Sequence, residues 1–177
     1  MPLCHSIGDV DDDGTLGAAL PDPVRRVAAA LEAAGQPADI RLLDQRTHTV
    51  DEAARALGVD ARQIVKSMVF RGARDGGLVL VVLAGDRLVD LDKVSAVLGE
   101  SVKRANPDWV RERTGFPIGG IPPLGHATLA TILVDAGVEG DEDLWAGAGT
   151  SRAMFKTSGR RLLGATGGTV ADVTRSG

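Results

Sequence analysis

A lysine set into an apolar segment is the first feature of this sequence that could do chemistry. Residues 63–71 read Gln-Ile-Val-Lys-Ser-Met-Val-Phe-Arg, so Lys66 stands among apolar and partly β-branched neighbours. Burying an ammonium without a partner is costly, and burial depresses the pKa of a lysine. Lys66 therefore either lies on a solvated edge of the structure, forms a pair or acts on a ligand.

The glycine-rich segment 114–126 is a second candidate, with the sequence Thr-Gly-Phe-Pro-Ile-Gly-Gly-Ile-Pro-Pro-Leu-Gly-His. Its glycines and prolines are incompatible with a regular helix or strand, but Phe116 and Leu124 are too apolar for a floppy linker, so we expect an ordered loop. Glycine lets the backbone approach a ligand and aim amide N–H groups at a carbonyl or phosphate oxygen, while Pro122 and Pro123 stiffen the exit. A tight structural connection without a ligand fits the composition equally well.

Residues 151–171 form a local basic segment that contains no acid; its cations are Arg152, Lys156, Arg160 and Arg161. Such clusters are usually solvated faces. The chain has a formal net charge of −4 and only 3% aromatic residues, which argues against nucleic-acid binding by bulk charge or by rows of stacking aromatics. This segment is therefore the one feature that suits a phosphate-bearing partner.

Several classes of protein are disfavoured by what the chain contains. Cys4 is the one cysteine, so an internal disulfide is impossible and a reducing, cytoplasmic location is expected. There is no apolar run of membrane-spanning length and no secretory signal pattern. The acidic cluster at 9–13 lacks the full ligand series of a calcium loop, so we expect residues 1–20 to be a flexible tail and predict no metal and no cofactor.

The elements that would position these residues follow from periodicity and turn residues. With 177 residues and 44% hydrophobic content, one globular domain is expected. Asp22 is expected to cap the first helix, with Pro23 at the first helical position, Thr49 with Glu52 suggests a capping box, and Asp75-Gly-Gly suggests a β-hairpin. Helices are predicted at 23–34, 49–57, 91–98, 107–113 and 159–164, with strands at 38–43, 63–71, 78–84, 102–105, 128–135, 144–148, 153–157 and 169–173. This order predicts an α+β fold with a mixed or antiparallel sheet.

Four of these segments together resemble the YbaK/ProX family of aminoacyl-tRNA deacylases, which is related to the editing domain of some bacterial prolyl-tRNA synthetases. They are Thr-Val-Asp-Glu-Ala-Ala at 49–54, Leu-Gly-Val at 57–59, the lysine segment 63–71, and Gly115 with Gly-Gly-Ile-Pro-Pro-Leu-Gly at 119–125. The resemblance implies a single α+β domain over residues 21–177, with a curved mixed sheet and short flanking helices. It also implies hydrolysis, in trans, of the ester that joins a wrong amino acid to the 3′ end of a tRNA.

The resemblance also assigns roles to residues. Lys66 matches the family's essential, catalytic lysine, and the Gly-x-x-x-Pro loop runs from Gly119 to Pro123. The implied substrate-binding residues are Gly119, Gly120, Ile121, Pro123, Thr47, His48, Gly149 and Ser151. Arg152, Lys156, Arg160 and Arg161 would contact the tRNA, and His126 is either a further contributor or a surface histidine.

The expected chemistry is modest because an aminoacyl ester is already reactive. Lys66 would offer a cation to the ester carbonyl, the ribose or the terminal phosphate, and backbone N–H groups of residues 119–121 would orient the substrate. Attack would come from water or from a thiol on the substrate itself. The amino acid is expected to be small, such as cysteine, alanine or serine, on a non-cognate tRNA that we expect to be tRNA(Pro).

The sequence and the resemblance also suggest partners for the protein and leave two other functions open. The expected partners are the aminoacylated tRNA and prolyl-tRNA synthetase, with no membrane contact, and the chain is expected to be a monomer or a homodimer. The alternative function is a non-catalytic module that binds tRNA ends or a nucleotide-like ligand and assists a synthetase. A purely structural or partner-binding domain is the third possibility.

Overall fold

The computed structural model describes residues 20–175 of the chain. All but the last residue of the predicted tail 1–20, including its acidic cluster, lies outside the described residues. The helices in the described part are α1 (Asp22–Ala33), α2 (Val50–Leu57), α3 (Leu91–Leu98), α4 (Pro107–Thr114) and α5 (Gly159–Thr166), with short 3-10 helices η1 (Ala61–Gln63) and η2 (Ala136–Val138). The strands are β1 (Ile40–Leu42), β2 (Ile64–Gly72), β3 (Leu78–Ala84), β4 (Val102–Arg104), β5 (Ala130–Asp135), β6 (Leu144–Gly147), β7 (Ala153–Thr157) and β8 (Thr169–Ala171).

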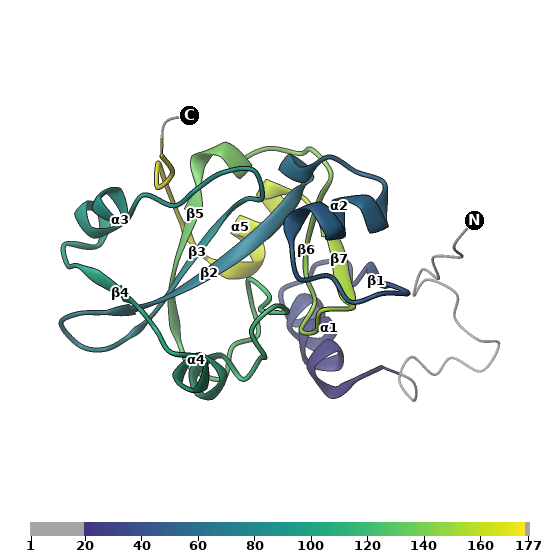
Figure 1. The fold of residues 1–177 in the computed structure, drawn as a ribbon, viewed down its shortest axis with the longest axis horizontal. Coiled ribbons are helices and arrows are strands. Elements are labelled where there is room, and N and C mark those ends of the chain that lie inside the picture. Colours follow the sequence, from purple (N-terminus) through teal and green to yellow (C-terminus); the bar gives the residue numbers. More distant parts are fainter. Residues whose placement is uncertain (1–19, 176–177) are drawn as a thin grey trace.

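The strands form one mixed sheet in the order β1-β7-β6-β2-β3-β5-β8, and β4 also pairs with β2 (Figure 1). The predicted hairpin of β2 and β3 is confirmed, with Val65 opposite Ala84 and Arg71 opposite Leu78. The pairs β2–β6, β3–β5 and β5–β8 are parallel, whereas β1–β7, β6–β7 and β2–β4 are antiparallel. The predicted α+β fold with a mixed sheet and short flanking helices is thus confirmed.

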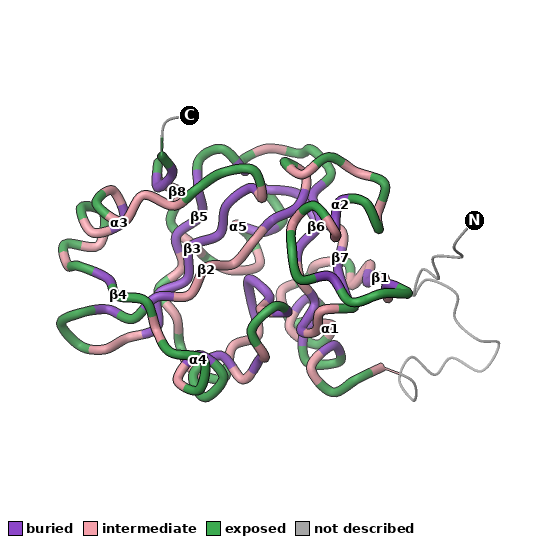
Figure 2. The backbone as a smooth tube through the Cα atoms, viewed as in Figure 1, coloured by how far each residue is buried: buried purple, intermediate pink, exposed green. Residues whose placement is uncertain are grey.

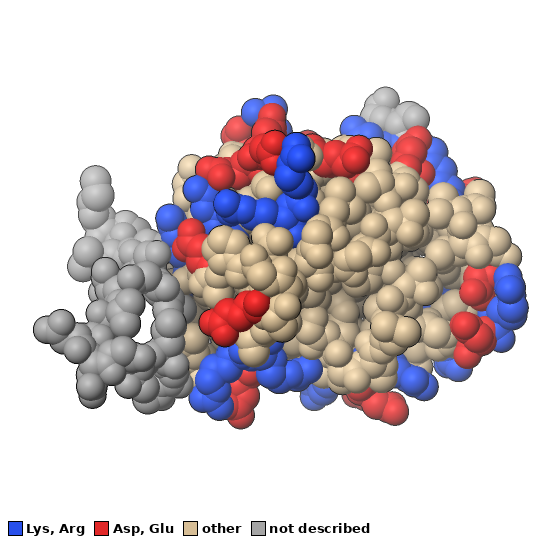
Figure 3. Space-filling model, turned by 180° about the vertical axis from the view of Figure 1, so that it is seen from behind, with Lys and Arg blue, Asp and Glu red and all other residues tan. Residues whose placement is uncertain are grey.

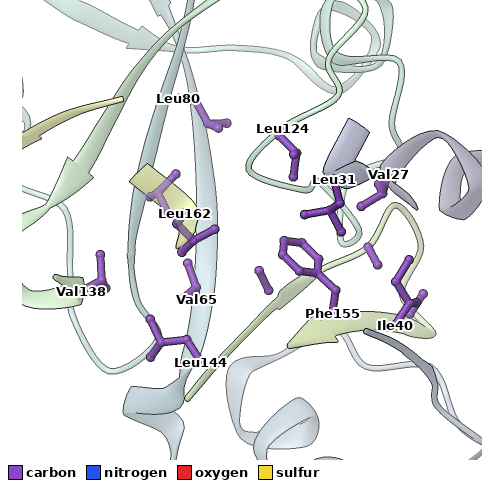
Figure 4. Close-up of a cluster of buried hydrophobic side chains, with 14 of the residues drawn as sticks. Val27, Leu31, Ile40, Val65, Leu80, Leu124, Val138, Leu144, Phe155 and Leu162 are labelled. Atoms are coloured by element: carbon purple, nitrogen blue, oxygen red, sulfur yellow. The ribbon is translucent and has the colours of Figure 1, made fainter. Parts of the chain in front are cut away.

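Helices cover both faces of this sheet, and β3 lies buried at its centre (Figure 2). On one face, Val27 and Leu31 of α1 pack with Phe155 of β7 and Leu162 of α5 (Figure 4). On the other face, Val94 of α3 belongs to a second cluster that includes residues of β2, β3 and β5. Because neighbouring residues of a strand point to opposite faces, β2 contributes to both cores and must hold Lys66 within this packing.

Local capping explains where the helices beside the site begin. The Thr49 hydroxyl accepts a hydrogen bond from the Glu52 N–H at 3.2 Å, and the Glu52 carboxylate accepts one from the Thr49 N–H, so the predicted capping box is confirmed. The prediction that Asp22 caps the first helix is wrong. Pro21 is the N-cap, and Asp22 lies in the first turn, where its carboxylate pairs with Arg25 instead of the backbone.

Candidate functional site

A cleft of about 530 Å³ opens along one edge of β2. β3 occupies the other edge throughout residues 65–71. On the cleft side, β6 pairs with residues 64–65 and β4 pairs with residues 70–72, so none of the strands in the described part of the chain lies beside residues 66–69. The cleft occupies this gap in the sheet. Its lining is Thr47, His48, Thr49, Val50, Ala53, residues 64–70, Arg104, Ala105, Val110, residues 118–121, Gly147 and Met154.

The backbone of β2 itself faces this gap. The Gly85 N–H donates to the Ile64 carbonyl at 2.6 Å and the Gly72 N–H to the Gly77 carbonyl at 2.9 Å, so even-numbered residues of β2 direct their backbone groups toward β3. Because this direction alternates along an antiparallel strand, Ser67 and Val69 direct theirs toward the cleft. The cleft therefore presents backbone donors and acceptors on a mainly apolar wall.

Lys66 lines the cleft and is held by a neutral partner. Its Nζ donates a hydrogen bond to the carbonyl oxygen of Gly85 at 3.0 Å. Burial lowers the pKa of Lys66, and the charge of Asp86 partly opposes this effect. None of the ion pairs among residues 20–175 includes Lys66. The ammonium thus keeps an uncompensated charge, and further N–H donors, for a ligand.

The glycine-rich loop that forms another wall is tied to α1. Arg26 donates to the carbonyl oxygens of Gly115 at 2.9 Å and Gly125 at 3.3 Å, which lie at the two ends of the loop. The same guanidinium lies 4.4 Å from the ring centroid of Phe116. His126 contacts the Pro122 carbonyl through Nε2 at 2.8 Å, and burial lowers the pKa of His126. These contacts fix the loop on the protein before any substrate arrives.

Within the loop, the amides are not equally available. The Gly120 N–H donates to the Pro117 carbonyl at 3.2 Å and so already has an acceptor within the loop. Gly119 has a φ of +95° and lines the cleft. No acceptor within the described residues is recorded for the N–H groups of Gly119 and Ile121. These are the two amides of the segment that remain for a ligand.

Some predicted substrate-binding residues line the cleft and others support it. Thr47, His48, Gly119, Gly120 and Ile121 are in the lining, whereas Pro123, Gly149 and Ser151 are not. The Ser151 carbonyl accepts from the Thr47 N–H at 2.7 Å and from the Thr47 hydroxyl at 3.1 Å. Gly149 is buried against Pro23, where an added Cβ would lie 2.7 Å from the Pro23 carbonyl oxygen. Ser151 and Gly149 therefore hold neighbouring segments in place behind the cleft wall.

The predicted tRNA-contacting residues lie outside the cleft lining, and most of them have partners within the chain. Lys156 pairs with Asp143 at 2.8 Å, and Arg160 forms a two-pronged contact with Asp141 at 2.7 and 3.0 Å. Arg152 donates to the carbonyls of residues 43 and 44. Figure 3, which views the molecule from behind, shows cations and acids intermixed around the outline. Their role in tRNA binding stays a prediction.

Sequence reasoning missed several residues of the lining, of which Arg104 is the most chemically distinct. Arg104 ends β4 and is placed opposite Phe70 of β2. The pairing that brings it to the cleft is between segments far apart in the chain and has no local pattern. Met154, Ala53 and Val110 were expected only as apolar residues of strands and helices, and they reach the cleft for the same reason.

Two further observations limit the chemistry of the described residues 20–175. Among them, no group of three or more His, Cys, Asp or Glu side chains is arranged to hold a metal ion. In the same part of the chain, no helix combines the length and apolar character needed to cross a membrane.

Comparison with known proteins decides the family. A profile described as aminoacyl-tRNA editing domain matches residues 44–165. The chain belongs to this editing-domain family. The predicted resemblance to YbaK/ProX deacylases is confirmed, and with it the class of activity, an aminoacyl-tRNA deacylase acting in translation fidelity. The predicted domain boundaries, 1–20 and 21–177, stay predictions.

Sequences similar to this chain occur both in proteins of comparable length and as a small part of much longer ligases. Over 124 residues the chain is 29% identical to the uncharacterized protein YwhH of Bacillus subtilis (strain 168), covering 70% of this chain and 78% of that protein. Over 92 residues it is 40% identical to the proline–tRNA ligase of Thermosipho melanesiensis, covering 51% of this chain but only 16% of the ligase. A crystal structure described as a candidate trans-editing enzyme for prolyl-tRNA synthetase superposes with a TM-score of 0.83 at 40% identity, covering 89% of this chain and 100% of that one.

Proposed function

We propose that this editing domain hydrolyses, in trans, the ester of a tRNA that carries the wrong amino acid, with the aminoacyl end bound in the β2 cleft. The observation that carries the proposal is the state of Lys66, an ammonium that donates to the Gly85 carbonyl at 3.0 Å and has no ion-pair partner among residues 20–175. It shares one cleft with the Gly119–Ile121 segment. The similarity to a protein described as a candidate trans-editing enzyme supports the assignment.

The charges of the lining suit the end of a tRNA. Besides His48, its basic residues are Lys66 and Arg104, and among the described residues the lining has no Asp, Glu or Cys. An anionic ligand therefore meets attraction from the lining itself, while Asp86, whose charge acts on Lys66, is not part of the lining. Lys66 would bind the ester carbonyl, the ribose or the terminal phosphate, and the free amides of Gly119 and Ile121 would orient the carbonyl and stabilise the oxyanion.

Within residues 20–175, the lining holds no carboxylate or thiol, but it does hold the hydroxyls of Thr47, Thr49 and Ser67 and the imidazole of His48. The imidazole forms no hydrogen bond with any of these hydroxyls in the described part of the chain, so no side chain there is paired with a general base. The attacking group would therefore be water or a nucleophilic side chain of the substrate itself. Positioning and charge stabilisation would supply the rate enhancement. Lys66 would act as a cation, and it is not assigned as the nucleophile.

The lining and the relatives together suggest the substrate. The wall is formed mainly by Val, Ile, Ala and Met side chains, and a volume of about 530 Å³ must also admit part of the terminal nucleotide. A small amino acid such as alanine, cysteine or serine fits this space. Since the relatives include proline–tRNA ligases, the tRNA would be tRNA(Pro), and prolyl-tRNA synthetase would be the working partner in the cytoplasm. Such a pocket discriminates by about 1–3 kcal/mol per methylene.

The test is the release of labelled amino acid from a panel of correctly and wrongly charged tRNAs, with Lys66→Ala beside the unmodified protein. We expect release from a misacylated tRNA(Pro) carrying a small amino acid, no release from prolyl-tRNA(Pro), and loss of release in the variant. Spontaneous rates across the whole panel would contradict the proposal.

A second candidate function is a binding module that holds the tRNA end without cleaving it. It is favoured by the lack of a carboxylate general base in the cleft lining. It predicts that the protein retains tRNA on a filter, that Lys66→Ala weakens this retention, and that ester cleavage stays at the spontaneous rate. The same panel therefore distinguishes the two candidates.

A further inference from the structure

Four exposed cations belong to β4, α4 and the end of β2, and two of them lie beside Trp109. They are Arg71, Lys103, Arg104 and Arg113. None of them takes part in an ion pair within the described residues 20–175. We refer to these residues with Trp109 as the β4–α4 surface.

Two of the cations are placed directly opposite each other. Arg71 of β2 and Lys103 of β4 are register partners in an antiparallel pair, so their side chains lie on the same face of the sheet. Like charges in such a position are destabilising. Neither cation forms an ion pair with an acid among residues 20–175. An anion bound from outside would relieve the repulsion between them, so the pair suits an anion-binding site.

Trp109 binds the cations from two elements together. The guanidinium of Arg71 lies 5.7 Å from the Trp109 ring centroid, and that of Arg113 lies 5.6 Å from it. Cation–π contacts at these distances hold the arginine side chains in defined positions without neutralising them. Asp108 and Glu112 on the same helix are exposed and are not recorded in an ion pair with either arginine. The positive charge is thus fixed in place and accessible.

Arg104 connects this surface to the cleft. It follows Lys103 on β4, is placed opposite Phe70, and belongs to the cleft lining together with Val110 of α4. Because neighbouring residues of a strand point to opposite faces, Lys103 and Arg104 place positive charge on both faces of β4, the strand that borders the cleft. By contrast, two of the four predicted tRNA-contacting cations are paired with Asp141 and Asp143.

We propose that the β4–α4 surface binds the phosphate backbone of the RNA strand whose 3′ end enters the cleft. Arginine and lysine that are held in place and unpaired suit phosphodiester oxygens, and such contacts position the RNA without reading its sequence. The proposal rests on the proposed function, because it takes tRNA to be the partner. In this proposal the RNA backbone binds beside the cleft, at the β4–α4 surface, and not at the basic segment 151–171.

The test uses a Lys103→Gln/Arg113→Gln variant and two substrates, an aminoacyl-tRNA and the same amino acid esterified to adenosine, which has no phosphate. On the tRNA, we expect kcat/KM to fall about tenfold or more at low salt, and the slope of log affinity against log salt to become shallower by about 1.5. On aminoacyl-adenosine, the variant and the unmodified protein should be equal. Arg175→Gln is the control, since it removes an exposed cation whose backbone N–H donates to the Leu88 carbonyl and which is not part of β2, β4 or α4.

Three results would overturn the proposal. In the first, the variant cleaves and binds tRNA as the unmodified protein does. In the second, Arg160→Gln/Arg161→Gln causes the loss instead. In the third, cleavage of both substrates falls equally, which would show a damaged cleft. Removing Lys103 relieves a like-charge pair, whereas removing Arg113 gives up one cation–π contact with Trp109. These two small effects oppose each other, so the urea midpoint of unfolding should stay close to that of the unmodified protein and serves as the folding control.

Failure of the proposed function gives a different pattern. If the unmodified protein cleaves neither substrate, the surface is tested by filter binding of uncharged tRNA alone, where the variant should bind more weakly and with the shallower salt slope. If the unmodified protein binds no tRNA, both proposals are overturned.

Discussion

Gly120 packs directly on the backbone of Thr150, so closely that an added Cβ would lie 2.6 Å from both the Cα and the carbonyl carbon of Thr150. This contact joins the glycine-rich loop to the turn that contains Gly149 and Ser151. The turn in turn receives the hydrogen bonds of Thr47. Two walls of the cleft are therefore assembled on one backbone contact that only glycine permits.

Gly120→Ala is expected to destabilise the protein by about 1–3 kcal/mol, because the new methyl group must displace backbone atoms of Thr150. Ester cleavage should fall as the loop moves. Gly164→Ala is the matched control: this glycine lies inside α5, its Cβ would meet only Gln36 at 3.5 Å, and alanine there should stabilise by about 0.5–1 kcal/mol. Urea unfolding measures both, and equal effects of the two substitutions would contradict the steric argument.

Arg26 should matter for the loop in a way that its neighbour Arg25 does not. Arg26→Ala removes hydrogen bonds to the carbonyls of Gly115 and Gly125 and the contact with Phe116. We expect a loss of about 1–2 kcal/mol in the free energy of unfolding and a fall in kcat, since the loop amides are no longer held. Arg25→Ala breaks an exposed pair with Asp22, worth about 0–1 kcal/mol, and an exposed hydrogen bond to the Leu20 carbonyl at 3.2 Å, and neither contact involves the loop. The prediction fails if both variants unfold and turn over alike.

His126 gives stability a pH dependence of known sign. Burial lowers its pKa from the ordinary value, so between the lowered pKa and about 6.5 the unfolded chain binds more protons than the folded one. Stability therefore falls as pH falls through this window. Comparing urea midpoints at about pH 7.5 and about pH 5.5, we expect the unmodified protein to lose more than His126→Asn. An equal loss would assign the effect to other groups.

The pH range in which His126 affects stability lies above the range in which the carboxylates do. The pKa of Glu52 is lowered, chiefly by hydrogen bonds from the backbone N–H groups of His48 and Thr49, and that of Asp141 by its contact with Arg160. Stability from groups with depressed pKa values is present above the unfolded pKa of about 4 and is lost only at lower pH.

Lys66 should give the reaction an alkaline limit. Burial lowers its pKa, so if the ammonium acts on the substrate, the ratio of enzymatic to spontaneous cleavage should decline at a pH below that of an ordinary lysine. Asp86 raises the pKa of Lys66, and Asp86→Asn should therefore move the decline to still lower pH. Rates measured across the alkaline range in both proteins test this, and coincident profiles would show that Lys66 does not set the limit.

Local chemistry made much of this fold predictable from sequence. The capping box of Thr49 and Glu52, the left-handed Gly58 that ends α2 and the hairpin of residues 63–71 with 78–84 depend on residues close together in the chain. The parallel pairs were not predicted individually, because β6 meets β2 across a long stretch of sequence. The 3-10 helix η2 was also missed; it is set by Asp135, whose carboxylate accepts from the Gly137 N–H at 3.1 Å.

The residues of the candidate site were likewise predictable only where their signal is local in the sequence. Lys66 and the loop 115–125 stood out because a charge in an apolar segment and a run of glycine and proline are visible locally. Arg104 could not be found this way, since only its pairing with β2 brings it to the cleft. Lys156 and Arg160 looked unpaired in the sequence because the segment 151–171 contains no acid. Their partners, Asp143 and Asp141, lie earlier in the chain and meet them only in the fold.

The most direct measurement is single-turnover cleavage of alanyl-tRNA(Pro), with the protein in excess, for the unmodified chain and Lys66→Ala. We expect the unmodified protein to release alanine above the spontaneous rate and to leave prolyl-tRNA(Pro) intact. We expect Lys66→Ala to fold normally and to release alanine only at the spontaneous rate. Cleavage by Lys66→Ala at the unmodified rate would contradict the role given to the ammonium that Gly85 holds in the cleft.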